Sequence, residues 1–112
     1  MGPEITLFPE TVRQLFEQAE HYKSRASSEV AERWIGQVRA TFRFLARNPA
    51  IGAAWPVPHR RHRLAGVRTW PVDGFEKFIV FYRPVEAGIE VLHVLRGSRD
   101  LGAILSSHDP SA

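Results

Sequence analysis

The spacing of apolar residues changes half-way along the chain, and this change constrains the fold more than any other feature of the sequence. In the first half, Val12, Leu15, Phe16, Ala19 and Tyr22 recur with the period of an α-helix and form one apolar face. In the second half, short apolar runs rich in β-branched and aromatic residues are separated by turn residues. Helices at one end of a sequence and strands at the other predict an α+β fold, with the helices packed on one face of a small sheet.

Local signals predict where the helices begin and end. A short β-type run over residues 4–8 is followed by Pro9, which is tolerated in the first turn of a helix. Ser27 or Ser28 is expected to cap the second helix, because a serine oxygen accepts a hydrogen bond from a free amide of the first turn. The second helix should end near Asn48, since the residue before a proline avoids helical geometry. These limits predict an antiparallel hairpin of two helices.

Three strands are expected after the helices, at about residues 64–72, 77–83 and 89–96. Turn residues at Asp73-Gly74 and over 84–88 join them into an antiparallel meander. The second and third runs are apolar on both faces, so they should lie centrally with both faces covered. The N-terminal run should join an edge of the meander, since a lone strand leaves its backbone groups unpaired. Residues 49–62 should form an irregular loop, residues 101–105 a short helix and residues 106–112 a frayed tail.

Length and composition narrow the classes of protein. A chain of 112 residues suits one domain, with its core expected over residues 4–105. No cysteine is present, which excludes a disulfide framework, a thiolate nucleophile and a sulfur-ligated metal. No apolar run approaches the roughly 20 residues of a membrane span, and the start does not resemble a secretory signal, so we expect a cytoplasmic protein. His59 and His62 lack a third ligand nearby, and neither a metal nor a cofactor is expected.

Arginine dominates the positive charge of the chain. The net charge is +3, and thirteen of the fifteen basic residues are arginines, whose planar donors suit carboxylates and phosphates. An acidic partner is therefore expected, either a nucleic acid or an acidic protein surface, although a GC-rich genome would produce the same bias. Arg60, Arg61 and Arg63 lie together in the basic run 59–63, which either contacts such a partner or is simply solvated. Trp55, in the same proline-rich loop, is expected to be partly exposed and to contact a partner.

Several local strings occur together and in a fixed order. They are the helical stretch 12–22, then Phe42-x-x-Leu45-x-x-Asn48-Pro49-x-Ile51-Gly52, then 66–72 (Gly-Val-Arg-Thr-Trp-Pro-Val), 78–83 (Phe-Ile-Val-Phe-Tyr-Arg) and 91–101 (Val-Leu-His-Val-Leu-Arg-Gly-Ser-Arg-Asp-Leu). Over residues 4–105 this order resembles the toxins of the RelE/ParE superfamily, and most of all its ParE, or plasmid-stabilisation, branch. The resemblance implies a type II toxin–antitoxin module. In such a module the antitoxin has a DNA-binding N-terminal part, and its acidic C-terminal segment wraps around the toxin.

The resemblance leaves the target of the toxin open. ParE-branch toxins are associated with DNA gyrase, whereas RelE-branch relatives are ribosome-dependent mRNA endoribonucleases that use lysines, arginines and a tyrosine near the C-terminus. This chain has no tyrosine after Tyr82 and no lysine after Lys77. RNA cleavage would need a base, cations and an acid around one phosphate. A substitute site would need Arg68, Arg83, His93 and Arg96 to converge on one face of the sheet, with His93 as the base and the arginines as a phosphate clamp.

The alternative to a catalytic role is that these residues only stabilise the fold or face solvent. His93 in a central strand is then a satisfied core residue, Arg83 a solvated strand end, Asp100 a structural latch, and Glu86 and Glu90 face water. We therefore expect a non-enzymatic toxin that binds DNA gyrase and is neutralised by a ParD-like antitoxin. A RelE-type ribonuclease and a non-toxic antitoxin-binding relative remain as alternatives. The residues expected to contact a partner are Trp55, Arg60, Arg61, Arg63, Arg68, Arg83, Arg96 and Arg99.

Overall fold

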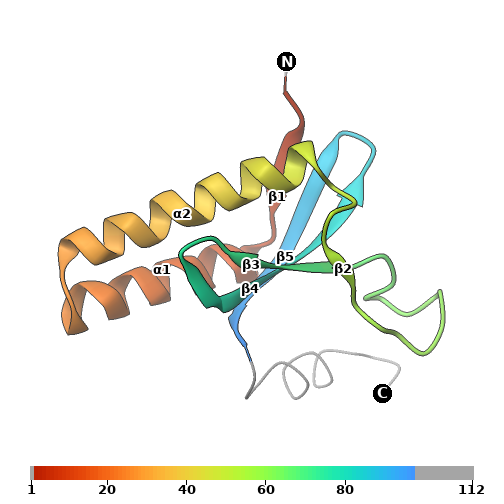
Figure 1. Ribbon diagram of the computed structural model, residues 1–112. Coiled ribbons are helices and arrows are strands. Elements are labelled where there is room, and N and C mark those ends of the chain that lie inside the picture. The colour runs from red at the N-terminus through yellow and green to blue at the C-terminus, as the bar shows by residue number, and fades with distance from the viewer. Residues whose placement is uncertain (1, 98–112) are drawn as a thin grey trace.

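A computed structural model describes residues 2–97 of the chain. Two helices cover one face of a five-stranded sheet whose strand order is β1-β5-β4-β3-β2 (Figure 1). The elements are β1 (Glu4–Leu7), α1 (Pro9–Arg25), α2 (Ser28–Arg47), β2 (Ala53–Ala54), β3 (Arg68–Val72), β4 (Phe75–Val85) and β5 (Gly88–Arg96). The predicted α+β fold, with an N-terminal strand, a helical hairpin and an antiparallel meander, is confirmed. The helix predicted over 101–105 and the tail after it lie outside the described residues.

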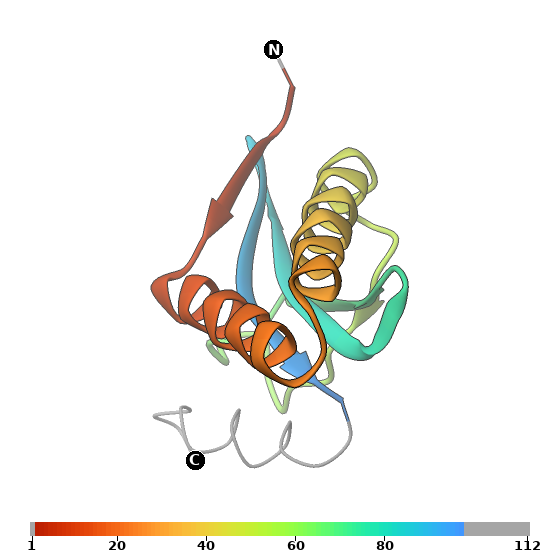
Figure 2. The ribbon, with the colours of Figure 1, turned by 90° about the vertical axis from the view of Figure 1, so that its left-hand side faces the viewer.

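The helix limits follow the local signals. α1 begins at Pro9, and the side chain of Ser27 caps α2 by accepting a hydrogen bond from the amide of Val30 at 3.2 Å. Arg47 is the last residue of α2, and Asn48 forms its C-terminal cap directly before the proline. Seen from the end of the hairpin, the two helices lie beside each other over the sheet (Figure 2).

The main core lies between the helices and the sheet. Trp34 of α2 is at its centre, with ring centroids 4.6 Å from Phe78 and 5.3 Å from Phe75. α1 buries a narrower face than its apolar residues predict, because it packs beside α2 and contacts the sheet mainly at β5, near the sheet edge. Phe16 is consequently 67% exposed, while Thr11 is buried and donates its hydroxyl hydrogen bond to the Val91 carbonyl at 2.9 Å. The expectation that Phe16 belongs to the packed face of this helix is wrong.

A second, smaller core covers the opposite face of the sheet. Leu64 and Val67, from the segment before β3, pack there against Phe81, Leu92 and Leu95. Both faces of β4 and β5 are therefore covered, as their apolar sequences predict. The same packing explains why β3 begins at residue 68 and not at 64: residues 64–67 form hydrogen-bonded turns instead of a strand.

The edges of the sheet differ from a simple meander. β1 joins an edge of the meander, as predicted; it lies next to β5 and pairs with it in parallel, so the sheet is mixed. The backbones approach closely there: a Cβ atom on Gly88 would lie 1.9 Å from the Glu4 carbonyl oxygen. At the other edge, β2 pairs antiparallel with β3 inside the segment predicted to be irregular. A strand of two residues is too short to show an alternating pattern in the sequence, so β2 is evident only from its pairing with β3.

Candidate functional site

The four residues of the hypothetical nuclease site are separated by the fold. Arg68 lies opposite Tyr82, and Arg96 lies opposite Phe78, so both share the helix-covered face but sit four residues apart along β4. In an extended strand that separation is roughly 13 Å. Arg83 follows Tyr82 directly and therefore lies on the other face. The convergence on one face that a nuclease site would need does not occur.

Arg83 is held inside a network and is not a solvated strand end. Its Nε donates to the Glu90 carboxylate at 2.8 Å, because the two residues are direct cross-strand neighbours. Its Nη1 donates to the carbonyls of Arg63 at 3.1 Å and Ala65 at 3.2 Å. The side chains of Arg83 and Glu90 are only 28% and 26% exposed, so the expectation that Glu90 faces water is also wrong. Glu86 is exposed, as expected.

His93 belongs to the core. Its ring is buried and lies 3.1 Å from the Gln14 side chain, measured between Nδ1 and Nε2. The oxygen of the same amide accepts a hydrogen bond from the Val94 amide at 2.9 Å, so Gln14 joins α1 to β5 through both of its polar atoms. A buried histidine engaged by its neighbours is poorly placed to abstract a proton from a macromolecular substrate. The structural interpretation of His93 is confirmed.

Tyr82 and Arg68 together fix the chain that follows α2. The Tyr82 hydroxyl is buried, accepts a hydrogen bond from the Gly52 amide at 2.9 Å and donates one to the Pro49 carbonyl at 2.8 Å. Arg68 donates to the Gly52 carbonyl at 2.7 Å. Burial raises the pKa of Tyr82, while the hydrogen bond from Gly52 and the charge of Arg68 act in the opposite direction. The tyrosine is therefore neutral at physiological pH and acts as a tie between sheet and loop.

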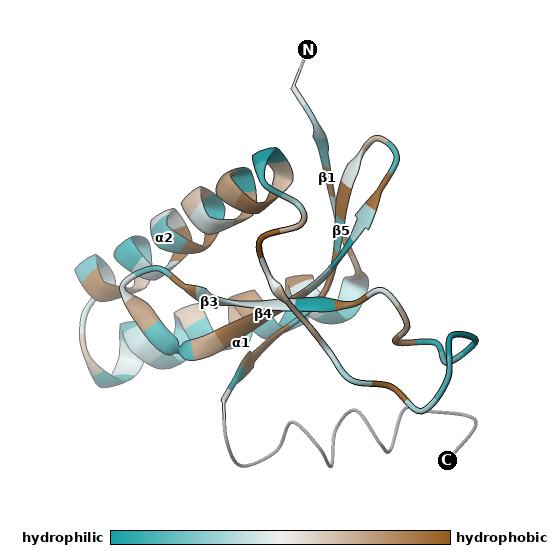
Figure 3. Cartoon of the chain, turned by 45° about the vertical axis from the view of Figure 1, so that its right-hand side comes forward, coloured by the Kyte–Doolittle hydropathy of each residue, from teal (hydrophilic) through white to brown (hydrophobic). Residues whose placement is uncertain are grey.

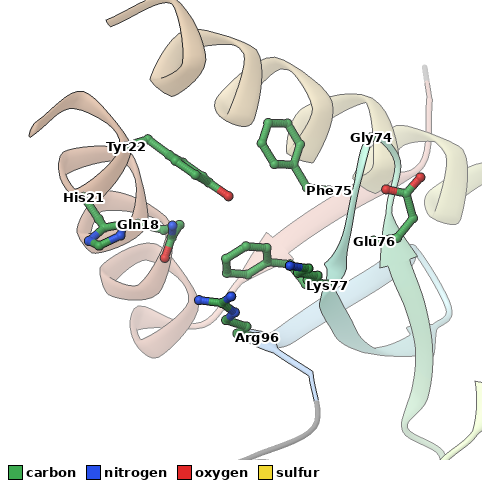
Figure 4. Close-up of a pocket in the computed structure, with 9 residues that line it drawn as sticks. Gln18, His21, Tyr22, Gly74, Phe75, Glu76, Lys77 and Arg96 are labelled. Atoms are coloured by element: carbon green, nitrogen blue, oxygen red, sulfur yellow. The ribbon is translucent and has the colours of Figure 1, made fainter. Parts of the chain in front are cut away.

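An open pocket of about 510 Å³ lies where the last turns of α1 meet the β3–β4 turn and the end of β5 (Figure 4). We call it the aromatic pocket; it is lined by Gln18, His21, Tyr22, Gly74, Phe75, Glu76, Lys77, Phe78 and Arg96. Phe78 is one of its lining residues. The Tyr22 hydroxyl and the Arg96 guanidinium point into the pocket (Figure 4). Rings beside cationic donors suit a ligand that carries an apolar group next to an anionic one.

Only Arg96 of this pocket was expected to contact a partner. Tyr22 and Lys77 were not expected beside Arg96, because they are far from it along the chain. Tyr22 was assigned to the apolar face of α1, where it does pack against Trp34, with ring centroids 5.8 Å apart. The one available signal was the position of Tyr22 in the last turns of the helix, where an apolar face meets polar residues.

The residues predicted to contact a partner on the loop are presented to solvent. Arg60, Arg61 and Arg63 are exposed, whereas His62 between them is buried. Trp55 is half-buried, as predicted, with its ring 5.1 Å from that of Phe81 in a T-shaped contact. Their contact with a partner stays a prediction. Arg99 and Asp100 lie outside the described residues.

The described part of the chain contains neither a metal-binding cluster nor a membrane-spanning helix. Across residues 2–97, no three histidine or acidic side chains come together in a way that could hold a metal ion. Neither helix in that range is long and apolar enough to cross a membrane.

Residues 5–101 match a protein family described as "ParE toxin of type II toxin-antitoxin system, parDE". The chain belongs to the ParE toxin family. As a ParE toxin, it is a component of a type II toxin–antitoxin system, and its place in the wider RelE/ParE superfamily is confirmed.

The fold of this ParE toxin is also similar to a solved structure titled "Chromosomal ParDE TA system from P. aeruginosa". The TM-score is 0.68, and the match covers 86% of this chain and 97% of the other at 19% sequence identity. At that identity the likeness shows the fold. No curated protein matches this ParE toxin.

Proposed function

We propose that this ParE toxin inhibits DNA gyrase by binding it, without cleaving a substrate, and that a ParD-like antitoxin neutralises it. The observation that carries the proposal is the dispersal of the residues from which a nuclease site would have to be built. Arg68 and Arg83 donate to backbone carbonyls, and His93 is buried. These side chains stabilise the fold and are not gathered around one position for a phosphate.

Cleavage of RNA requires a base, an acid and cationic donors within hydrogen-bond reach of one phosphate. Arg68 and Arg96 lie on the same face but roughly 13 Å apart along the strand direction, and Arg83 is on the opposite face. An inhibitor that acts by binding needs only a complementary surface. The placement of these residues therefore favours inhibition by binding, and the ParE family, as distinct from RelE-like ribonucleases, favours gyrase as the target.

Charge complementarity supports an acidic antitoxin segment. The toxin has a net charge of +3 and a pI near 10.0. The aromatic pocket offers the rings of Tyr22 and Phe78 to an apolar side chain and the Arg96 guanidinium to a neighbouring carboxylate. A segment with alternating apolar and acidic residues would satisfy both parts of this pocket.

The test is an assay of gyrase with purified toxin. Wild-type toxin should inhibit the supercoiling of relaxed plasmid, and addition of the antitoxin encoded beside it should restore supercoiling. Induced expression should cause filamentation and an SOS response. Unaffected supercoiling, combined with 5′-mapped cuts in translated messages, would replace the proposal with a ribonuclease. Harmless expression and unaffected supercoiling would identify a non-toxic relative.

A further inference from the structure

Positive charge is concentrated in one continuous part of the chain. Residues 33–72 contain eight arginines and no aspartate or glutamate. Since the whole chain carries +3, this segment carries +8 and the remaining residues together carry −5. The segment comprises most of α2, then β2, the loop after it and β3. The acidic residues precede this segment on β1, α1 and the start of α2, or follow it in the β3–β4 and β4–β5 turns, on β4 and β5, and beyond residue 97.

Three exposed arginines of this segment lie close together in residues 59–63, which we call the basic loop. It projects beyond β2 as a hydrophilic extension (Figure 3). The loop is nevertheless ordered by its own contacts: the His62 amide donates to the His59 carbonyl at 3.1 Å, and Nδ1 of the buried His62 accepts from the Leu64 amide at 3.1 Å. His62 therefore points inward and fixes the backbone from which the arginines project.

A second anchor comes from the sheet. Arg83 of β4 reaches the carbonyls of Arg63 and Ala65 and is itself oriented by Glu90 of β5. Leu64, the residue between those carbonyls, is buried in the second core. The basic loop is thus attached to the two central strands. Arginines on a fixed backbone lose less conformational freedom on binding than arginines on a mobile one.

The surroundings of the loop indicate the class of partner. The large apolar side chains that are exposed in residues 2–97 are Val12, Phe16, Phe44, Ile51 and Val85, and none lies in the loop. A protein partner would need an apolar centre of contact, whereas arginines alone suit phosphate oxygens. Trp55 packs against Phe81 and so does not present a free ring to an unpaired base, as binding of single strands requires.

We propose that the basic loop binds the phosphate backbone of duplex DNA. This goes beyond inhibition of gyrase, because it gives the toxin a direct contact with the nucleic acid on which gyrase acts. Arg60 and Arg61 are exposed, and no hydrogen bond or ion pair engages their side chains within the described residues. Binding should be independent of base sequence and should weaken steeply with salt, since each neutralised phosphate releases counterions.

The experiment measures binding of the full toxin to a short fluorescein-labelled DNA duplex by anisotropy, at several salt concentrations. The loop variant is Arg60→Gln/Arg61→Gln. Its matched control is Lys23→Gln/Arg25→Gln, which removes the same charge from exposed positions at the end of α1. We expect the loop variant to reduce the slope of log affinity against log salt by up to roughly 1.8, at about 0.9 for each phosphate contact. The control variant should retain the wild-type slope.

The proposal would be overturned if wild-type toxin failed to bind the duplex at low salt, or if the control variant lost as much affinity as the loop variant, since only net charge would then matter. It would also be overturned if single-stranded RNA of equal length bound more tightly and through the loop. Finally, a loop variant that bound DNA normally but no longer bound the antitoxin would show that the loop contacts protein. Thermal unfolding of both variants checks that the fold is intact, and the supercoiling assay reports on gyrase inhibition independently.

Discussion

Tyr82→Phe should destabilise the toxin well beyond the effect expected for the loss of one hydroxyl group. The hydroxyl is buried, accepts from the Gly52 amide and donates to the Pro49 carbonyl. Phenylalanine keeps the ring in the core but leaves both backbone groups without their partner. A buried amide left unsatisfied costs about 1–3 kcal/mol, and the carbonyl bond, which is closer to solvent, contributes about 0.5–1.5 kcal/mol.

The expected loss in the free energy of unfolding is therefore about 1.5–4.5 kcal/mol. That is a large part of the roughly 5–15 kcal/mol typical of a domain. Urea denaturation followed by circular dichroism would measure it, with the midpoint falling while the m-value stays constant.

Tyr22→Phe is the matched control for this substitution. It makes the same chemical change in a half-buried ring whose hydroxyl faces the aromatic pocket and forms no hydrogen bond within the described residues. Its unfolding free energy should stay close to that of the wild type. Equal losses in the two variants, or a negligible loss in Tyr82→Phe, would refute the assignment of Tyr82 as the tie between the sheet and residues 49–52.

Three further predictions concern pH, the edge strand and the basic loop. Because burial raises the pKa of Tyr82 above its usual value of 10.0, its neutral form stabilises the fold below pH 10. That contribution should disappear as pH rises through the higher folded-state pKa, and the pH dependence should be shallower in Tyr82→Phe; identical slopes would contradict this. Gly88→Ala should displace β1, since the added Cβ would lie 1.9 Å from the Glu4 carbonyl oxygen; hydrogen exchange of the β1 amides should accelerate, and unchanged protection would exclude the clash. Arg83→Met should leave Glu90 unpaired and release the basic loop, which trypsin should then cleave faster than in the Glu86→Gln control; equal rates would separate Arg83 from the order of the loop.

Much of the fold could be predicted from the sequence, because the signals concerned are local. The helical spacing of apolar residues, the cap at Ser27 and the stop at Asn48 act over a few positions. The turn at Asp73-Gly74 and the apolar runs of β4 and β5 likewise predict the meander and its two covered faces. The ordered strings of the family cover the same elements, so family and fold were predicted together.

The sites depended on contacts between distant parts of the chain. Whether Arg68, Arg83 and Arg96 converge is set by cross-strand register, since a shift of one residue moves a side chain to the opposite face. The exposure of Phe16 depends on how far α1 covers the sheet, which its amphipathic pattern does not specify.

The sequence by itself determined the helices, the three strands of the meander, the family and the preponderance of arginine, all of which arise from neighbouring residues or from composition. The tertiary structure alone decided the parallel pairing of β1 with β5, the short strand β2 and the aromatic pocket that brings Tyr22 to Arg96. It also decided that His62 and Arg83 hold the basic loop while its arginines face solvent. The physical reason is that packing and strand pairing join residues far apart in sequence, and a local pattern contains no information about which partner will be met.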